Sequence, residues 1–139
     1  MSSRYAVVLI QNPENSQEYI LGRRKDNGKI NFPAGGINDG EDPIAGARRE
    51  VKEETGFDAK NLKLVLVNNK KDKEGRPILV YVYTAEIDGS PSLEKDPDME
   101  FQSIFWMNPL RVPTSELHIP VDENSGLKAL IEIVKKRGL

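Results

Sequence analysis

The stretch that decides the fold runs from Gly35 to Phe57 and reads GGINDGEDPIAGARREVKEETGF. Its second half predicts a helix with Asp42 as the N-cap, because an aspartate carboxylate can accept hydrogen bonds from the free amides of the first turn. Pro43 suits the first helical position, where its missing N–H leaves no bond unmade. Gly56 suits the left-handed residue that commonly ends a helix. We therefore expect a short helix between Asp42 and Gly56.

The predicted helix carries a concentration of acidic side chains. At 3.6 residues per turn, Glu50 lies on the same face as Glu53 and Glu54, and carboxylates placed so closely repel one another. Arg49 can pair with Glu53 one turn further on, but one arginine cannot neutralise three glutamates. Most acidic clusters on helices are simply solvated faces. A hard divalent cation would neutralise this one, since Mg²⁺ takes carboxylate oxygens, waters and substrate phosphates as ligands.

Nine positions in this stretch favour the metal-binding interpretation. They follow the order Gly, five residues, Glu, seven residues, Arg-Glu-hydrophobic, one residue, Glu-Glu, one residue, Gly-hydrophobic. The matching residues are Gly35, Glu41, Arg49, Glu50, Val51, Glu53, Glu54, Gly56 and Phe57. From average residue usage, a chance match in a chain of this length is on the order of 10⁻⁷. The stretch therefore resembles the box of the Nudix hydrolases, which split a nucleoside diphosphate linked to another group.

The resemblance implies roles for the glutamates of the helix. In the Nudix hydrolases this segment forms the metal and pyrophosphate site, where water attacks one phosphorus. By position in the box, Glu50 and Glu54 are expected to be the principal metal ligands. Glu53 is expected to be a further ligand or the general base, oriented by Arg49, and the three residues Arg49, Glu50 and Glu53 are expected to carry the catalysis.

The resemblance also gives roles to the loop before the helix. Glu41 is expected to be an accessory ligand or an electrostatic support near the substrate. Gly35 and Gly36 are expected to form a tight loop in which a backbone carbonyl or amide reaches the metal or the phosphate. Divalent metals neutralise phosphate oxygens and lower the pKa of bound water. The expected cofactor is therefore Mg²⁺, with Mn²⁺ as a substitute.

Three further candidates lie outside the box. Arg23 and Arg24 end a predicted strand, and strand alternation puts them on opposite faces, so one of them is expected to grip substrate phosphates. A basic group at a strand end is more often solvated charge. Glu100, in an acidic stretch shortly before Trp106, is expected to add a ligand or base, although an exposed loop explains this stretch equally well.

Other prominent side chains are better explained by structure than by function. His118 is the single histidine, and it lies in a proline-broken loop, so we expect it to be incidental. Trp106 and Phe101 are expected in the core. Tyr81 and Tyr83 share a strand face and could line a nucleobase pocket, but core packing is the expected role.

Length and composition predict one domain over residues 1–139 and exclude several classes of function. The net charge of −2 makes duplex nucleic acid an unsuitable partner. Without cysteine there are no disulfides, thiolate zinc sites or cysteine nucleophiles. No apolar run has the length of a membrane span, and the N-terminus lacks a signal-peptide pattern. We expect a cytoplasmic monomer or homodimer whose partner is a small-molecule nucleotide.

The order of predicted elements is strands, a helix, more strands and a helix, which is a mixed α/β arrangement. It looks like the α/β/α sandwich, with a mixed sheet, of the Nudix fold. Within the first helix, Ile44, Ala47 and Val51 predict the face that packs on the sheet. The predicted strands are Tyr5–Gln11, Glu18–Arg24, Leu62–Val67, Ile78–Ile87 and Phe101–Met107, and the second helix begins near Ser125.

The favoured substrate is a nucleoside or deoxynucleoside triphosphate, because the chain carries little besides the box. Alternatives are ADP-ribose, a nucleotide sugar or a dinucleoside polyphosphate. The downstream proline typical of ADP-ribose hydrolases is missing, since Lys73 occupies its offset and the nearest proline is Pro77. The tyrosine typical of dinucleoside polyphosphate hydrolases is also missing there, the first being Tyr81. A non-catalytic nucleotide-binding module is a remote alternative, because it would be expected to have lost box glutamates.

Overall fold

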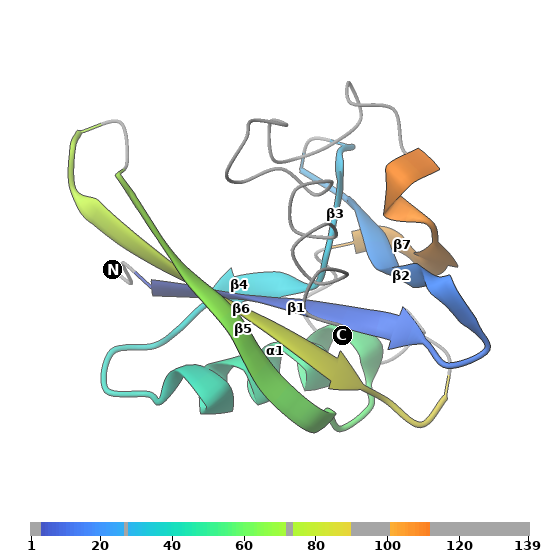
Figure 1. Ribbon diagram of the computed structural model, residues 1–139. Coiled ribbons are helices and arrows are strands. Elements are labelled where there is room, and N and C mark those ends of the chain that lie inside the picture. Colours follow the sequence, from blue (N-terminus) through green and yellow to red (C-terminus); the bar gives the residue numbers. More distant parts are fainter. Residues whose placement is uncertain (1–3, 27, 72–73, 90–100, 112–139) are drawn as a thin grey trace.

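The computed structural model describes residues 4–26, 28–71, 74–89 and 101–111. Within these residues the chain forms a sheet and one α-helix, which lies beneath the sheet in Figure 1. In chain order the elements are β1 (Arg4–Asn12), β2 (Asn15–Arg24), β3 (Ile30–Asn31), β4 (Ala34–Gly36), α1 (Pro43–Thr55), β5 (Lys60–Lys71), β6 (Pro77–Glu86), β7 (Phe101–Met107) and the 3₁₀ helix η2 (Pro109–Arg111).

Strand β1 organises the sheet, because it pairs with three other strands. It runs parallel to β6 along Arg4–Ile10 and antiparallel to β4, with Tyr5 opposite Gly36. At its end it forms the predicted hairpin with β2, where Gln11 faces Tyr19. Strand β5 adds to β6, while β3 and β7 add to the two edges of β2. The sheet is therefore mixed, as predicted.

The core has two parts, one on each face of β1. Side chains of a strand alternate between faces, so Val7 and Leu9 enter one cluster while Val8 and Ile10 enter the other. The second cluster lies between the sheet and α1, and it includes Ala47 and Val51 of the helix. Its other members include Ala6, Ile20, Ile37, Tyr83 and Ala85, with Tyr81 and Trp106 packed against it. The expectation that Tyr81, Tyr83 and Trp106 serve the core is confirmed.

Helix α1 begins and ends at the predicted residues, but its start differs in detail. Pro43 is the first helical residue, and Gly56 ends the helix with a left-handed φ of 81°. Asp42 is the N-cap residue, as predicted, but its side chain does not make the predicted capping hydrogen bond. The Asp42 backbone carbonyl instead accepts from Gly46 N–H at 3.0 Å, as in any first helical turn. Pro43 has no amide proton, so the first helical position leaves no donor in need of a partner.

The predicted sheet-facing stripe of α1 is correct only in part. Ala47 and Val51 are fully buried, but Ile44 is 40% exposed. Contacts of α1 with the sheet fall mainly on β1 and β4, and the first turn, which carries Ile44, extends beyond the part that packs tightly. Periodicity identifies the face of a helix, but it does not say how far along the helix that face is covered.

The segment around the two glycines also differs from the prediction. Gly35 and Gly36 are not in a tight loop but in the short strand β4, where Ala6 faces Gly35. Strand β5 is longer than the predicted Leu62–Val67, because its polar ends still pair with β6 as far as Lys71–Pro77. His118, Glu100 and the predicted helix near Ser125 lie outside the described residues. No helix in the described ranges is long and apolar enough to cross a membrane.

Candidate active site

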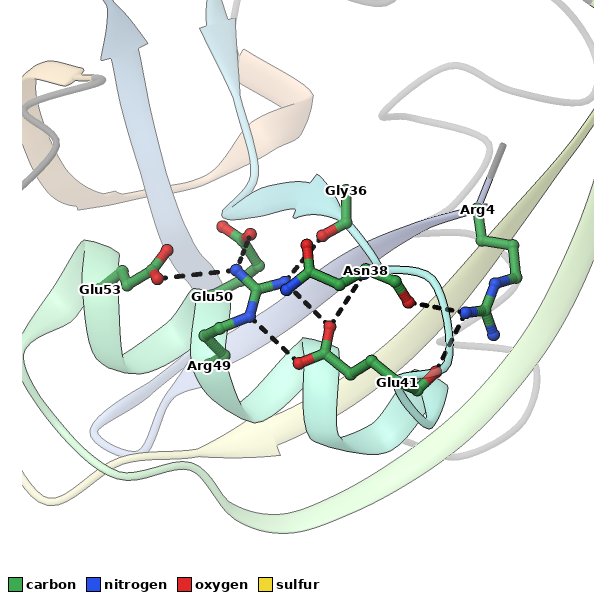
Figure 2. Close-up of polar contacts among 7 residues, drawn as sticks. All are labelled: Arg4, Gly36, Asn38, Glu41, Arg49, Glu50 and Glu53. Atoms are coloured by element: carbon green, nitrogen blue, oxygen red, sulfur yellow. Dashed lines mark hydrogen bonds and ion pairs between the residues drawn. The ribbon is translucent and has the colours of Figure 1, made fainter. Parts of the chain in front are cut away.

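Arg49 is the centre of the charged cluster on α1, as Figure 2 shows. Its guanidinium donates to both carboxylate oxygens of Glu41, from Nε at 3.2 Å and from Nη2 at 3.0 Å. Its Nη1 donates to Glu50 Oε1 at 2.9 Å and lies 3.6 Å from Glu53 Oε1. Nη2 also donates to the carbonyl of Gly36 at 2.8 Å. The predicted pair of Arg49 with Glu53 is confirmed, and Arg49 also joins β4 and the following loop to the helix.

Glu41 is held from two sides. Besides Arg49, the backbone N–H of Asn38 donates to Glu41 Oε1 at 3.0 Å. The hydrogen bond from Arg49, followed by the one from Asn38, lowers the pKa of Glu41 below its ordinary value. The pKa of Arg49 is raised in turn, chiefly by the hydrogen bond to Glu41. This fork-to-carboxylate pair therefore stays charged and keeps a fixed geometry.

Glu50 is buried, and its carboxylate lies against the backbone of Gly35. A Cβ added at residue 35 would come within 2.2 Å of the Glu50 carboxyl carbon, so the Glu50 side chain would have to shift. Glu50 is only 5% exposed. The requirement for glycine at residue 35 therefore comes from space for a carboxylate, not from the turn that the sequence suggested.

Gly46, one turn before Glu50 on the buried face of the helix, plays a similar part. A Cβ there would lie 3.1 Å from both Glu41 Oε1 and Ile37 Cγ1. The missing methyl group gives the loop room to lie close to α1. A glycine within a helix costs about 1 kcal/mol relative to alanine, so close approach of this loop offsets part of that cost.

The two remaining glutamates of the helix differ in burial. Glu54 is 1% exposed, whereas the Glu53 side chain is 30% exposed and is reached by Arg49. Burying a carboxylate is costly unless an opposite charge or hydrogen bonds compensate it. Glu50 and Glu54 are thus two buried acids one turn apart, beside a third that is partly exposed.

These residues fit a divalent cation in their chemistry. Carboxylate and carbonyl oxygens are the donors that Mg²⁺ prefers, and the space at Gly35 that a Cβ would fill holds the Glu50 carboxylate. Glu50 and Glu54 would hold such an ion, with Glu53 or a backbone carbonyl joining them. In the described part of the chain, no three acidic or histidine side chains are already grouped around one point. Arg49 supplies the positive charge beside Glu50 in this conformation.

Arg23 and Arg24 are not brought to this cluster. Arg23 Nη1 donates to the carbonyl of Gly28 at 2.7 Å. Arg24 forms an ion pair with Asp26 at 2.7 Å. Both therefore contact their own turn, and Figure 1 shows this end of β2 far from α1. Glu100, the third candidate outside the box, lies outside the described residues.

A hollow of about 720 Å³ opens at the end of the sheet that lies far from the loop between β4 and α1. No residue of β4 or α1 lines it. Its lining comes from β1, β2, β5 and β6 and includes Leu9, Tyr19, Lys63, Thr84 and Glu86. We place the candidate active site at α1 because one arginine joins three carboxylates there. The charged residues that line the hollow, Lys60, Lys63, Glu86 and Asp88, are all exposed.

Sequence reasoning missed two residues of the network. Arg4 Nη2 donates to the carbonyls of Asn38 and Glu41, and Asn38 supplies the backbone bond to the Glu41 carboxylate. Arg4 precedes Glu41 by 37 residues. No local pattern links the two, and only the pairing of β1 with β4 brings them together. The signal available in the sequence was a single charged residue before an apolar strand.

Comparison with known proteins confirms the family resemblance predicted from the box. The family model described as NUDIX domain matches residues 1–125. A protein of Bacillus subtilis (strain 168) named "Putative 8-oxo-dGTP diphosphatase" is 25% identical over an alignment of 155 positions, which covers 99% of this chain and 98% of the relative.

Two solved structures show the same fold. A NUDIX hydrolase from Nitrosomonas europaea has a TM-score of 0.74 and 18% identity, covering 99% of this chain and 89% of the other. A MutT NUDIX hydrolase from Burkholderia pseudomallei has a TM-score of 0.66 and 19% identity, covering 96% of both chains. The chain therefore belongs to the NUDIX family and is a pyrophosphohydrolase of that family.

Proposed function

We propose that the protein is a Mg²⁺-dependent hydrolase of nucleoside and deoxynucleoside triphosphates. The observation that carries the proposal is the cluster at α1, in which Arg49 joins Glu41, Glu50 and Glu53 beside the buried Glu54. A site for phosphoanhydride cleavage needs hard oxygen ligands, a base and a rigid frame. The cluster supplies all three on a single helix and the loop before it.

Each residue has a separate task in the proposed reaction. Glu50 and Glu54 hold the cation, which when bound neutralises phosphate oxygens and lowers the pKa of water. Glu53, the most exposed of the three, accepts the proton of the attacking water. Arg49 orients Glu53 through their ion pair, and Glu41 fixes Arg49 in turn. Gly35 and Gly36 would let the backbone of β4 come close to a bound metal and the phosphates.

The bond changes are those of a hydrolysis. The water oxygen forms a bond to one phosphorus while the bridging P–O bond breaks, and the bridging oxygen leaves with the other phosphate. When the group linked to the nucleoside diphosphate is itself a phosphate, the products are a nucleoside monophosphate and pyrophosphate. Because little covalent chemistry falls to the protein, position and charge at α1 determine the rate.

The preference for a triphosphate has one line of support beyond the box. The Bacillus subtilis relative, matched along almost its whole length, has a name that refers to 8-oxo-dGTP. We therefore include an oxidised purine nucleotide among the first substrates to test. Nucleotide sugars, ADP-ribose and dinucleoside polyphosphates complete the panel, because the same bond cleavage applies to each.

The test is a product analysis. The protein is incubated with Mg²⁺ and dATP, dGTP, 8-oxo-dGTP, UDP-glucose, ADP-ribose and a dinucleoside tetraphosphate, and the products are separated by ion-exchange chromatography. We expect nucleoside monophosphate and pyrophosphate from at least one triphosphate, and their loss in Glu53→Gln and Glu54→Gln. If the wild type releases nothing, the proposal fails for this panel, and if both variants equal the wild type, the site is wrong.

A further inference from the structure

We propose that Arg4, at the start of β1 and outside the box, is a positioning residue for the active centre. It fixes the turn that carries Glu41, and this inference rests on the function proposed above. Its guanidinium nitrogen Nη2 donates to the carbonyl of Asn38 at 2.9 Å and to that of Glu41 at 3.1 Å, as Figure 2 shows. One nitrogen thus binds the first and last residues of the turn.

Backbone hydrogen bonds close the turn from Asn38 to Glu41 and hold it against Arg4. Glu41 N–H donates to the Asn38 carbonyl at 3.0 Å, and the same carbonyl accepts from Arg4. Ile37 N–H donates to the Arg4 carbonyl at 2.9 Å, so main chain and side chain of Arg4 both contact this loop. Gly40 adopts a left-handed φ of 80°, which residues other than glycine rarely take. Arg4 therefore ties a conformation of the loop to the start of β1.

The position of this turn affects the catalytic glutamates through the side chain of Glu41. The Glu41 carboxylate accepts from Asn38 N–H within the turn and from Arg49 on the helix. Arg49 in turn contacts Glu50 at 2.9 Å and Glu53 at 3.6 Å. A shift of the turn would move the carboxylate that holds Arg49, and with it the two acids. Displacements of about 1 Å in supporting groups can reduce rates on the order of 10²-fold.

A purely structural tie between β1 and the loop predicts a different result. It would change stability but leave the turnover of the folded enzyme intact. A positioning role predicts a fall in kcat that depends on Glu41, because Glu41 carries the effect to Arg49. Two independent measurements separate these cases, one on the loop itself and one on turnover.

The first measurement is hydrogen exchange of the amides of Asn38 and Glu41 in the wild type, Arg4→Ala, Arg4→Lys and Arg48→Ala. Arg48 is the matched control, because its guanidinium also donates to a backbone carbonyl, that of Ala59 at 3.2 Å. We expect exchange at the turn to rise about tenfold in Arg4→Ala, less in Arg4→Lys, and not in Arg48→Ala. Unchanged exchange in Arg4→Ala overturns the inference, whatever the protein hydrolyses.

The second measurement is steady-state kinetics on the best nucleotide found above. We expect kcat to fall about tenfold in Arg4→Ala with KM changed by less than about twofold, and partial recovery in Arg4→Lys. In a Glu41→Gln background the same Arg4→Ala change should cost much less, because the two residues act in series. An unchanged kcat, or additive effects of the two changes, overturns the positioning role. An inactive wild type would instead refute the proposed function, and the exchange data alone would then decide whether Arg4 holds the turn.

Discussion

Arginines occur at two places that the sequence marked as functional, α1 and the end of β2, and their surroundings differ. Arg49 contacts carboxylates from the loop and from the helix, at 2.9 Å to Glu50 and 3.0 Å to Glu41. Arg24 pairs with Asp26, two residues further along the same turn. An arginine is therefore a good sign of a functional site when separate segments of the chain bring several acidic side chains to it. Basic residues that are merely adjacent in the sequence are a poor sign.

The two regions also differ in their exposure to water. Glu50 is 7% exposed in its side chain, whereas Asp26 is 59% exposed. Charges interact more strongly where water is excluded, and an exposed ion pair contributes only about 0–1 kcal/mol. Substitutions at α1 should therefore have much larger effects than those at the end of β2.

The largest effect is expected from Glu50→Gln. This change keeps the shape of the buried side chain but removes a charge that the cation needs, so kcat should fall on the order of 10²–10⁴-fold. Initial rates of nucleotide cleavage measure it. Glu14→Gln, at the exposed β1–β2 turn, is the control and should retain the wild-type rate. Near-normal turnover in Glu50→Gln would remove α1 from the chemistry.

Gly35→Ala should have the next largest effect. The new Cβ would overlap the Glu50 carboxyl group, so the carboxylate must move and kcat should fall on the order of 10²-fold. The overlap should also reduce the free energy of unfolding by about 1–3 kcal/mol. Chemical denaturation and kinetics are measured together.

Gly75→Ala is the control for Gly35→Ala, because Gly75 has a left-handed φ of 80° and no heavy atom within 4 Å of the added Cβ. It should lose about 1–2 kcal/mol of stability from the backbone alone and keep its activity. Equal kcat values for the two alanine variants would show that contact with Glu50 is irrelevant to turnover.

Arg49→Lys should reduce kcat/KM by about 10–100-fold. Lysine keeps the charge but cannot donate to both oxygens of Glu41 while reaching Glu50. Comparing the kinetics of Arg49→Lys with those of Arg48→Lys, at the preceding residue of the same helix, measures how much the two-pronged guanidinium contributes to kcat/KM. An equal loss in both variants would indicate a general effect on the helix instead.

The pH dependence of stability tests the Glu41–Arg49 pair. Hydrogen bonds from Arg49 and then Asn38 lower the pKa of Glu41 from its ordinary value of 4.5 in the folded protein. Its stabilising contribution is therefore fully present above the unfolded value and is lost as the pH falls through the lower folded value. The difference in unfolding temperature between wild type and Glu41→Gln should be largest near neutrality and shrink in acid. A difference that does not vary with pH would contradict the pair.

Arg24→Ala should have the smallest effect. Its exposed ion pair with Asp26 predicts a change in unfolding free energy of about 0–1 kcal/mol, and its distance from α1 predicts unchanged kinetics. Urea denaturation and KM for the preferred nucleotide check both. A clear rise in KM, here or in Arg23→Ala, would restore the expectation that this end of β2 grips phosphates.

The sequence predicts well what neighbouring residues determine. Pro43 and Gly56 mark the ends of α1 because their effects are local to the backbone. The five predicted strands correspond to β1, β2, β5, β6 and β7, whereas the short strands β3 and β4 were not predicted. It predicts poorly what depends on distant segments. Contact between Gly35 and Glu50 requires β4 to pair with β1. The exposure of Ile44 depends on how far along α1 the sheet packs against the helix.

The candidate site shows the same division. The box identifies Glu50, Glu53 and Glu54. It predicts neither the difference in their burial nor which of them Arg49 contacts. Arg4 could not be found at all, because its contacts with the turn depend on tertiary pairing. Motifs name the chemical groups, whereas the fold decides which of them are held, buried or left in solvent.

The most direct test of the account is titration calorimetry of Mg²⁺ and Mn²⁺ into the protein with a non-hydrolysable triphosphate analogue, corrected for binding to the analogue alone. We expect saturable binding by the wild type and affinity weaker by about 10–100-fold in Glu54→Gln. The absence of any cation uptake by the wild type, with or without the analogue, would contradict the claim that the acids of α1 form a metal site.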